Sequence, residues 1–298
     1  MTENHKRDHG SIPRRMRRWL LILAISMGRL IWIGSLRLPA DLTQPLVLSR
    51  PARNAALDKE TLKIGVFNIH GCKGRDGRRD VARVANAVTD LDLLSLHEVR
   101  GGYFDNQAHE LGRRLDMAAL FAPTEWRWGR NDFGNGLLTK VQLQEIHQIP
   151  QIGASDAHRN ALLTSFQFGG KSVRLLIAHL DLTTDRDRQI SSITDIFMSL
   201  KSPAILMGDL NCKRSHPRIK ELLRETGVHN ALSASRDNRR DWIITKGLTA
   251  LSSDVIRNEA SDHPLVVAEL VLNREPESDR SKTSKKRLQQ AAKARDKN

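Results

Sequence analysis

Between Leu62 and Leu270 the chain repeats one pattern, in which a short apolar run is followed by a polar residue. Apolar or alternating runs of about four to eight residues are typical of β-strands. The pattern predicts strands at 62–68, 91–98, 135–139, 161–166, 173–179, 204–207, 241–245 and 265–270. Apolar residues at helical spacing predict helices at 80–90, 107–115, 186–200 and 217–226. Strands that alternate with helices, with some hairpin-like strand pairs, predict an α+β domain of mixed sheets covered by helices.

The stretch 204–211 shows this pattern most clearly. Four apolar residues lie between Pro203 and Gly208, and Asp209 and Asn211 follow at once. If the chain stays extended past Gly208, these two polar side chains point to the same side, roughly 6.5–7 Å apart. An ordinary strand-to-turn exit accounts for the same residues equally well. The other strand ends therefore decide between the two interpretations.

The N-terminal region has a different composition. Residues 1–18 are polar and basic, and residues 19–34 are apolar with one charge, Arg29. A basic segment followed by an apolar one predicts a signal peptide or a signal anchor. The positive-inside rule then places the rest of the chain outside the cytoplasm, either anchored in a membrane or secreted. The alternative is an amphipathic or core-docking helix on a cytoplasmic protein.

Three further boundaries follow from composition and charge. Residues 35–60 contain three prolines and predict a linker, residues 61–272 form the globular domain, and residues 273–298 predict a basic, disordered tail. The net charge of +14 lies mostly in the ends: +6 in residues 1–60, +3 in residues 61–272 and +5 in the tail. The basic ends are suited to an acidic polymer or a membrane surface. Because the domain itself is nearly balanced, the high pI of the whole chain is only weak evidence that the domain binds nucleic acid.

The chain has two cysteines, Cys72 and Cys212, and each follows one of the polar strand ends. Two cysteines provide neither a disulfide scaffold nor a zinc site. Two unpaired buried thiols are the favoured interpretation. One bridge remains the alternative if the two loops adjoin in an oxidising compartment.

Polar groups lie at or beside six of the apolar runs. They are Asn68, Glu98, His179, Asp209 with Asn211, Asp241, and Asp262 with His263. Each is unremarkable alone, but strand ends that converge on one edge would make a cleft rich in oxygen donors. Such a cleft suits Mg²⁺ or Mn²⁺, which bind carboxylates together with substrate phosphate and water.

These residues lie in short motifs that resemble, in order and spacing, those of the endonuclease/exonuclease/phosphatase superfamily. The motifs are Phe67-Asn68, His97-Glu98-Val99, Ala178-His179-Leu180, Gly208-Asp209-Leu210-Asn211, Asp241-Trp242-Ile243 and Ser261-Asp262-His263-Pro264. The resemblance covers residues 62–270. It implies that residues 61–272 are a catalytic domain with a deoxyribonuclease I-like four-layer sandwich, in which two mixed β-sheets pack face to face and are flanked by helices.

The resemblance also implies a metal site and a phosphate site. Glu98 and Asp262 match metal ligands, and Asn68 matches a residue that orients metal or phosphate. Asp209 and Asn211 match residues that position the nucleophile and the phosphate, or that hold a second metal ion.

Two histidines complete the implied chemistry. His263 matches the catalytic histidine, with Asp241 as the carboxylate that orients it, and His179 matches a phosphate-contacting histidine. A histidine held in one tautomer by an aspartate can accept a proton from water near neutral pH. AP endonucleases have a tyrosine where this chain has His179, which argues against abasic-site repair, and many relatives have glutamine where this chain has His97.

We therefore expect a divalent-metal phosphodiester hydrolase, monomeric and acting on nucleic acid. Asn135 and Arg159 are weaker candidates for the substrate side of the site. A lipid or inositol-phosphate phosphoester hydrolase, of the sphingomyelinase kind, is the second hypothesis. An inactive binding protein on the same fold is the third.

Overall fold

The computed structural model of the protein describes residues 13–35, 37–50, 59–88, 90–102, 105–127, 132–151, 158–183, 185–232 and 240–273. The predicted tail, 273–298, lies outside the described residues except for Asn273. So does most of the basic segment 1–18.

The described strands form two mixed sheets. The first has the strand order β1 (Arg37–Pro39), β4 (Ala118–Arg127), β5 (Phe133–Thr139), β3 (Leu93–Arg100), β2 (Leu62–Asn68), β13 (Leu265–Leu272) and β12 (Leu248–Ile256). The second has the order β10 (Val228–Asn230), β11 (Asp241–Lys246), β9 (Ala204–Asp209), β8 (Lys171–His179), β7 (Arg159–Phe168) and β6 (His147–Gln151). The pairs β2/β3 and β8/β9 are parallel, and the other pairs are antiparallel.

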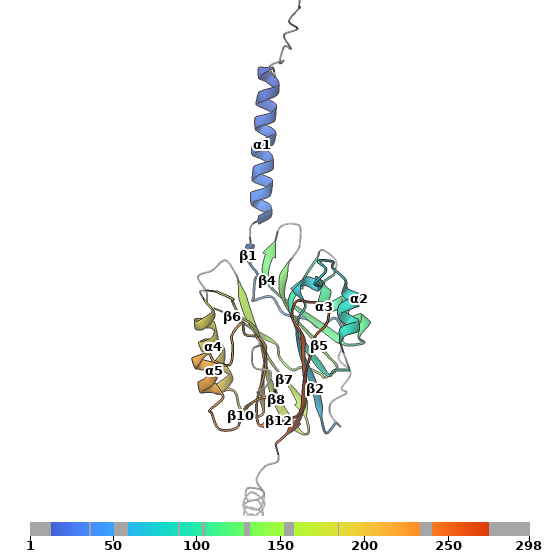
Figure 1. The fold of residues 1–298 in the computed structure, drawn as a ribbon, viewed down its shortest axis with the longest axis vertical. Coiled ribbons are helices and arrows are strands. Elements are labelled where there is room, and N and C mark those ends of the chain that lie inside the picture. Colours follow the sequence, from blue (N-terminus) through green and yellow to red (C-terminus); the bar gives the residue numbers. More distant parts are fainter. Residues whose placement is uncertain are drawn as a thin grey trace, which may run out of the picture.

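Helices cover the outer face of each sheet, so the domain has four layers (Figure 1). The helices α2 (Val81–Ala87) and α3 (Gln107–Arg114) lie on the first sheet, and η1 (His70–Cys72) follows β2. The helices α4 (Arg186–Ser199) and α5 (Pro217–Leu222) lie on the second sheet.

The core between the sheets follows from strand alternation. On β2, Ile64 and Val66 lie in the cluster between the two sheets, whereas Phe67 lies in the cluster under α2 and α3. On β9, Ile205 and Met207 lie in the central cluster, while Leu206 packs in the cluster that includes α4 and α5. Because side chains alternate between faces along a strand, each buried strand contributes to two apolar layers.

The N-terminal part of the chain meets the sandwich at one end. The helix α1 (Arg14–Ser35) stands away from the sandwich (Figure 1). After it, β1 pairs with β4, and further along Ser49 exchanges hydrogen bonds with the backbone of Ala119. Part of the segment predicted as a linker therefore lies on the domain. Among the described helices none is both long and apolar enough to cross a membrane.

The predicted fold class is confirmed, and the differences lie at element ends, at sheet edges and in β4, which lies between β1 and β5. Strands β1, β4, β6, β10 and β12 were not predicted. Only Leu248 of β12 is buried, so this strand lacks the apolar run that marks a strand in the sequence. The helix predicted at 217–226 ends at Leu222. The helix predicted at 80–90 ends at Ala87, and Asp80 caps its start by accepting a hydrogen bond from the Arg83 amide.

Gly208 is the one glycine that the junction of β8 and β9 requires. Its φ is +147°, and a Cβ placed there would lie 1.9 Å from the carbonyl oxygen of Ala178. We expect Gly208→Ala to lower the free energy of unfolding by about 2 kcal/mol or more beyond the cost of Gly170→Ala, which has φ +73° but open space around it. Urea unfolding of both variants measures the difference. Equal losses would contradict the close approach as the cause.

Candidate active site

Strand alternation carries polar side chains into the open end of the layer between the sheets. On β2, Asn68 continues the face of Ile64 and Val66. His179 and Asp209 continue the inward faces of β8 and β9, and their Cα atoms are register partners. Asp241 begins the inward face of β11 and is the register partner of Asp209. All four side chains are almost completely buried.

His263 and Asp241 form the predicted pair. The Nδ1 atom of His263 lies 2.9 Å from Oδ2 of Asp241, and its Nε2 atom lies 3.8 Å from Oδ2 of Asp209. Because the carboxylate can only accept, Nδ1 carries the proton in this bond. In the neutral ring Nε2 is then the unprotonated nitrogen, directed toward the other carboxylate.

Asn68 connects the two sheets. Its amide nitrogen donates to Oε1 of Glu98 at 3.0 Å and to Oδ2 of Asp209 at 3.1 Å. Its backbone oxygen accepts a hydrogen bond from the Ser261 hydroxyl at 2.7 Å, which ties the end of β2 to the segment that carries His263. The structure thus brings together Asn68, Glu98, Asp209, Asp241 and His263.

Glu98 reaches this group only because β3 is irregular. The pairing of β3 with β5 shifts register between Leu96 and Val99, and Glu98 has φ +57°. With regular alternation Glu98 would lie on the face of β3 opposite to His97, and so would point away from Asn68 and Asp209. A bulge re-aims a side chain, and a non-glycine residue in this region costs about 1–3 kcal/mol. That backbone strain is located at the predicted metal ligand.

The two histidines beside Asp209 have opposite pKa shifts. Burial by itself lowers the pKa of His263, but the hydrogen bond that His263 donates to Asp241 and the charges of Asp241, Asp209 and Asp262 outweigh it and raise the pKa to about 9. For His179, burial is the largest cause that holds the pKa well below its usual range, and the nearby charge of Arg159 acts in the same direction. His179 is therefore neutral, and its 3.8 Å approach to Oδ2 of Asp209 is a polar contact rather than an ion pair.

Arg159, at the start of β7, faces the same acidic region. Burial lowers its pKa, and the negative charges of Asp181, Glu125, Glu98 and Asp209 oppose this shift. Its guanidinium carbon lies 5.9 Å from the ring centre of Phe133, and its buried Nε has no hydrogen-bond partner among the residues that the structure describes.

A buried chain of hydrogen bonds supports His179 from behind, and sequence reasoning did not predict it. The ring of His97 lies 5.3 Å from that of His179, and its Nδ1 donates to Oδ1 of Asn135 at 2.9 Å. Asn135 in turn donates to Oδ1 of Asn160 at 2.8 Å, which joins the two sheets. Burial lowers the pKa of His97 to about 4, which keeps the ring neutral in this chain. The side chain of Asn135 therefore forms its hydrogen bonds within the protein. The one sequence signal for this structural role is that Asn135 lies two residues before the inward-facing Leu137 on β5.

At Asn211 the structure shows the strand-to-turn exit and not the extended alternative. The strand β9 ends at Asp209, and Asn211 has φ +49°, so the chain turns instead of staying extended. The backbone amide of Asn211 donates to Oδ1 of Asp209 at 3.0 Å, and its side-chain nitrogen donates to the Leu180 carbonyl oxygen at 2.9 Å. Asn211 thus fixes the loop and the orientation of Asp209.

The carboxylates and His263 give an arrangement that fits a divalent cation. One ligand atom each from Asp209, Asp241 and His263 lies within 4.8 Å of the others. Asp262, predicted as a ligand with Glu98, is more exposed, and its Oδ1 lies 3.3 Å from Nδ1 of His70. The buried carboxylates of Asp209 and Asp241 lie near the half-buried carboxylate of Glu98. Three negative charges this close repel one another unless a cation lies between them, so the arrangement suits a hard cation.

The two cysteines are unpaired and buried, as the favoured interpretation predicts. Burial raises the pKa of each thiol to about 12. Neither thiol is therefore a nucleophile at neutral pH.

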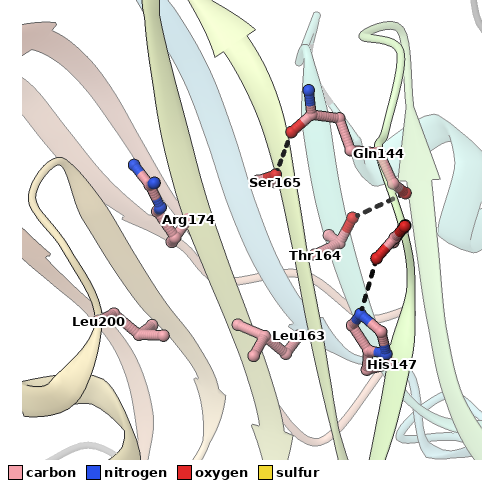
Figure 2. Close-up of a pocket in the computed structure, with 8 residues that line it drawn as sticks. Gln144, His147, Leu163, Thr164, Ser165, Arg174 and Leu200 are labelled. Carbon is pink, nitrogen blue, oxygen red and sulfur yellow. Dashed lines mark hydrogen bonds and ion pairs between the residues drawn. The ribbon is translucent and has the colours of Figure 1, made fainter.

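A depression of about 620 Å³ lies elsewhere, on the outer face of the second sheet. Figure 2 shows the residues that line it. Its polar groups bond to one another: the Ser165 hydroxyl donates to the side-chain oxygen of Gln144, the Thr164 hydroxyl donates to the Gln144 backbone oxygen, and His147 contacts Glu145. No predicted site residue lies there, so this depression is not the candidate active site.

Comparison with known proteins agrees with this geometry. Residues 65–263 match the Endonuclease/Exonuclease/phosphatase family, and the chain belongs to it. Members of this family are divalent-metal-dependent enzymes that hydrolyse phosphoester bonds, and the chain is an enzyme of this class. No curated protein matches the chain.

Solved structures show the same fold at low sequence identity. The endonuclease/exonuclease/phosphatase from Beutenbergia cavernae is 18% identical, with a TM-score of 0.59, over 74% of this chain and 73% of that one. The human Nocturnin catalytic domain with bound sulfate is 20% identical, with a TM-score of 0.58, over 76% of this chain and 100% of that one. D. rerio TDP2 complexed with a single-strand DNA product is 15% identical, with a TM-score of 0.55, over 71% and 99% of the two chains.

Proposed function

We propose that the protein is a divalent-metal-dependent phosphodiesterase that acts, as a monomer, on nucleic acid. The observation that carries this proposal is the His263–Asp241 pair, whose second ring nitrogen faces Asp209 at 3.8 Å. The strongly basic ends of the chain and the similarity to a TDP2 structure that holds a single-strand DNA product support nucleic acid as the substrate.

In this proposal His263 is the general base. Asp241 holds the Nδ1 proton, so Nε2 is the atom that accepts the proton from the attacking water. Asp209 lies beside that nitrogen and orients the water. His179, kept neutral by its surroundings, donates a hydrogen bond to a phosphoryl oxygen and so stabilises the charge that develops there.

We propose Glu98 and Asp262 as ligands of Mg²⁺ or Mn²⁺, with Asn68 orienting metal or phosphate. Asp209 and Asn211 border a second candidate position. When bound, a divalent cation supplies positive charge against the phosphoryl oxygens and the carboxylates, which lowers the pKa of His263 toward neutrality.

A lipid or inositol-phosphate substrate is the second candidate, and one observation favours it. The strand β1 pairs with Glu125–Arg127 of β4. Glu125 pairs with Phe133, which in turn pairs with Arg100 on β3. The chain after α1 therefore joins the sandwich at the end where Glu98 lies. A membrane that holds the N-terminal segment would face the candidate site.

We expect the full chain with Mg²⁺ to cleave plasmid DNA or single-stranded RNA faster than sphingomyelin or inositol phosphates. His263→Ala should lower the rate by about 10²–10⁴, because removal of a general base costs that much. His229→Ala, an exposed histidine on β10, serves as the matched control and should retain the wild-type rate. Rates of product release on the four substrates, with and without EDTA, measure both effects.

Near-full activity of His263→Ala on the preferred substrate would contradict the proposed base. Faster turnover of sphingomyelin or inositol phosphates would favour the second candidate. Absence of turnover on all four substrates would favour an inactive binding protein on this fold.

We further propose that residues 19–34 act as a signal peptide or signal anchor, with the catalytic domain outside the cytoplasm. The support is the basic residues before this segment and the exposure of its apolar side chains, among them Trp19, Leu21 and Leu23. We expect alkaline phosphatase, which is active only outside the cytoplasm, to be active when fused after Leu272 in a bacterial host. A fusion that begins at Thr61 should be inactive. Equal, low activity of both fusions would favour the cytoplasmic alternative.

A further inference from the structure

A basic pocket adjoins the candidate active site. It has a volume of about 380 Å³ and lies between the loop after β9, the starts of α4 and α5, and the residue before β11. We call it the basic pocket and define it by Arg186, Asn211, Lys213, His216 and Arg240. The exposed Leu182 forms part of its wall.

The pocket is continuous with the catalytic residues. Asn211 lines it, and the backbone amide of the same residue bonds to Oδ1 of Asp209. On the other wall, Arg240 precedes Asp241, the partner of His263, and the Arg240 carbonyl oxygen accepts the Leu210 amide at 2.9 Å. A group bound in the pocket therefore lies next to whatever His263 and Asp209 act on.

The charge of the pocket is positive and largely unneutralised. Asp187 contacts Nε of Arg186 at 3.0 Å and Nε2 of His216 at 3.4 Å. Lys213 and Arg240 are exposed, and neither forms an ion pair with a carboxylate in the described part of the chain. Because Lys213 and Arg240 line a concave wall and are not neutralised by Asp187, they attract an anion.

We propose that the basic pocket binds a second phosphate of the substrate, the one next to the phosphate being cleaved in a nucleic-acid strand. This inference rests on the proposed function, because it assumes that the cleaved group lies at His263. Arginine and lysine are the residues that contact strand phosphates, and the leucine in the wall offers apolar surface to the attached sugar or base. The pocket would thus select a substrate with neighbouring phosphates over a single phosphodiester.

The test compares a substrate that has neighbouring phosphates with one that has none. Lys213→Ala and Arg240→Ala are measured on an oligothymidylate and on bis(p-nitrophenyl) phosphate, a single phosphodiester. We expect KM for the oligothymidylate to rise in each variant, with kcat/KM for the small substrate unchanged. Lys63→Ala, an exposed lysine near the start of β2, is the matched control and should behave as wild type.

Binding without turnover separates this inference from the proposed function. Fluorescence anisotropy with labelled oligothymidylate in EDTA gives the affinity as a function of salt. Loss of one phosphate contact on a single strand should reduce the slope of log affinity against log salt by about 0.7. The basic ends are present in every variant, so they do not change the difference. Tm values confirm that each variant is folded.

Three outcomes would overturn the inference. One is an oligothymidylate KM and salt slope that match Lys63→Ala. Another is an equal loss on both substrates, which would place the defect in the catalytic residues. The third is an unchanged oligothymidylate affinity together with weaker binding of an inositol polyphosphate, which would assign the pocket to that class. If wild type cleaves neither substrate, the proposed function fails, and the anisotropy slopes still decide whether the pocket binds phosphate.

Discussion

The candidate site depends on the alternation of side chains between the two faces of a strand, in strands that are buried on both faces. Each of β2, β8, β9 and β11 puts apolar residues into the layer between the sheets and then, at one end, a polar residue in the same phase. The apolar layer fixes the register, because a one-residue slip would bury the polar group on the wrong face. The packing that forms the core therefore also determines the positions of Asn68, His179, Asp209 and Asp241.

Opposite environments give the two histidines different chemistry. His263 is partly open and has Asp241 and Asp209 near its two nitrogens, which raises its pKa to about 9. His179 is almost completely buried, and burial together with the nearby Arg159 lowers its pKa, so the ring stays neutral although Asp209 lies 3.8 Å away. Two titratable residues whose pKa values are shifted in opposite directions are typical of a site in which one residue transfers protons and the other donates a hydrogen bond.

The alternation read from the sequence predicted much of this arrangement. It was enough for Asn68 and Asp209, which continue regular apolar strands. It was not enough for Glu98, because a register shift that the sequence does not mark turns this side chain to the other face. The strand-end pattern named Glu98 as a candidate, and the resemblance to the family supplied its role as a metal ligand. For Asn211 the sequence left an extended and a turned chain open, and the left-handed backbone of Asn211 shows that the chain turns. The edge strand β12 has too few buried residues to show a pattern.

The central claim is that these strand ends form one cation site. A crystal structure of the full chain with Mn²⁺ tests it most directly, because the anomalous signal locates the ion. The account predicts a peak between the two sheets, within coordination distance, about 2.0–2.2 Å, of a carboxylate oxygen of Glu98 or Asp209. Manganese peaks confined to other surfaces, with these carboxylates left uncoordinated at saturating metal, would contradict it.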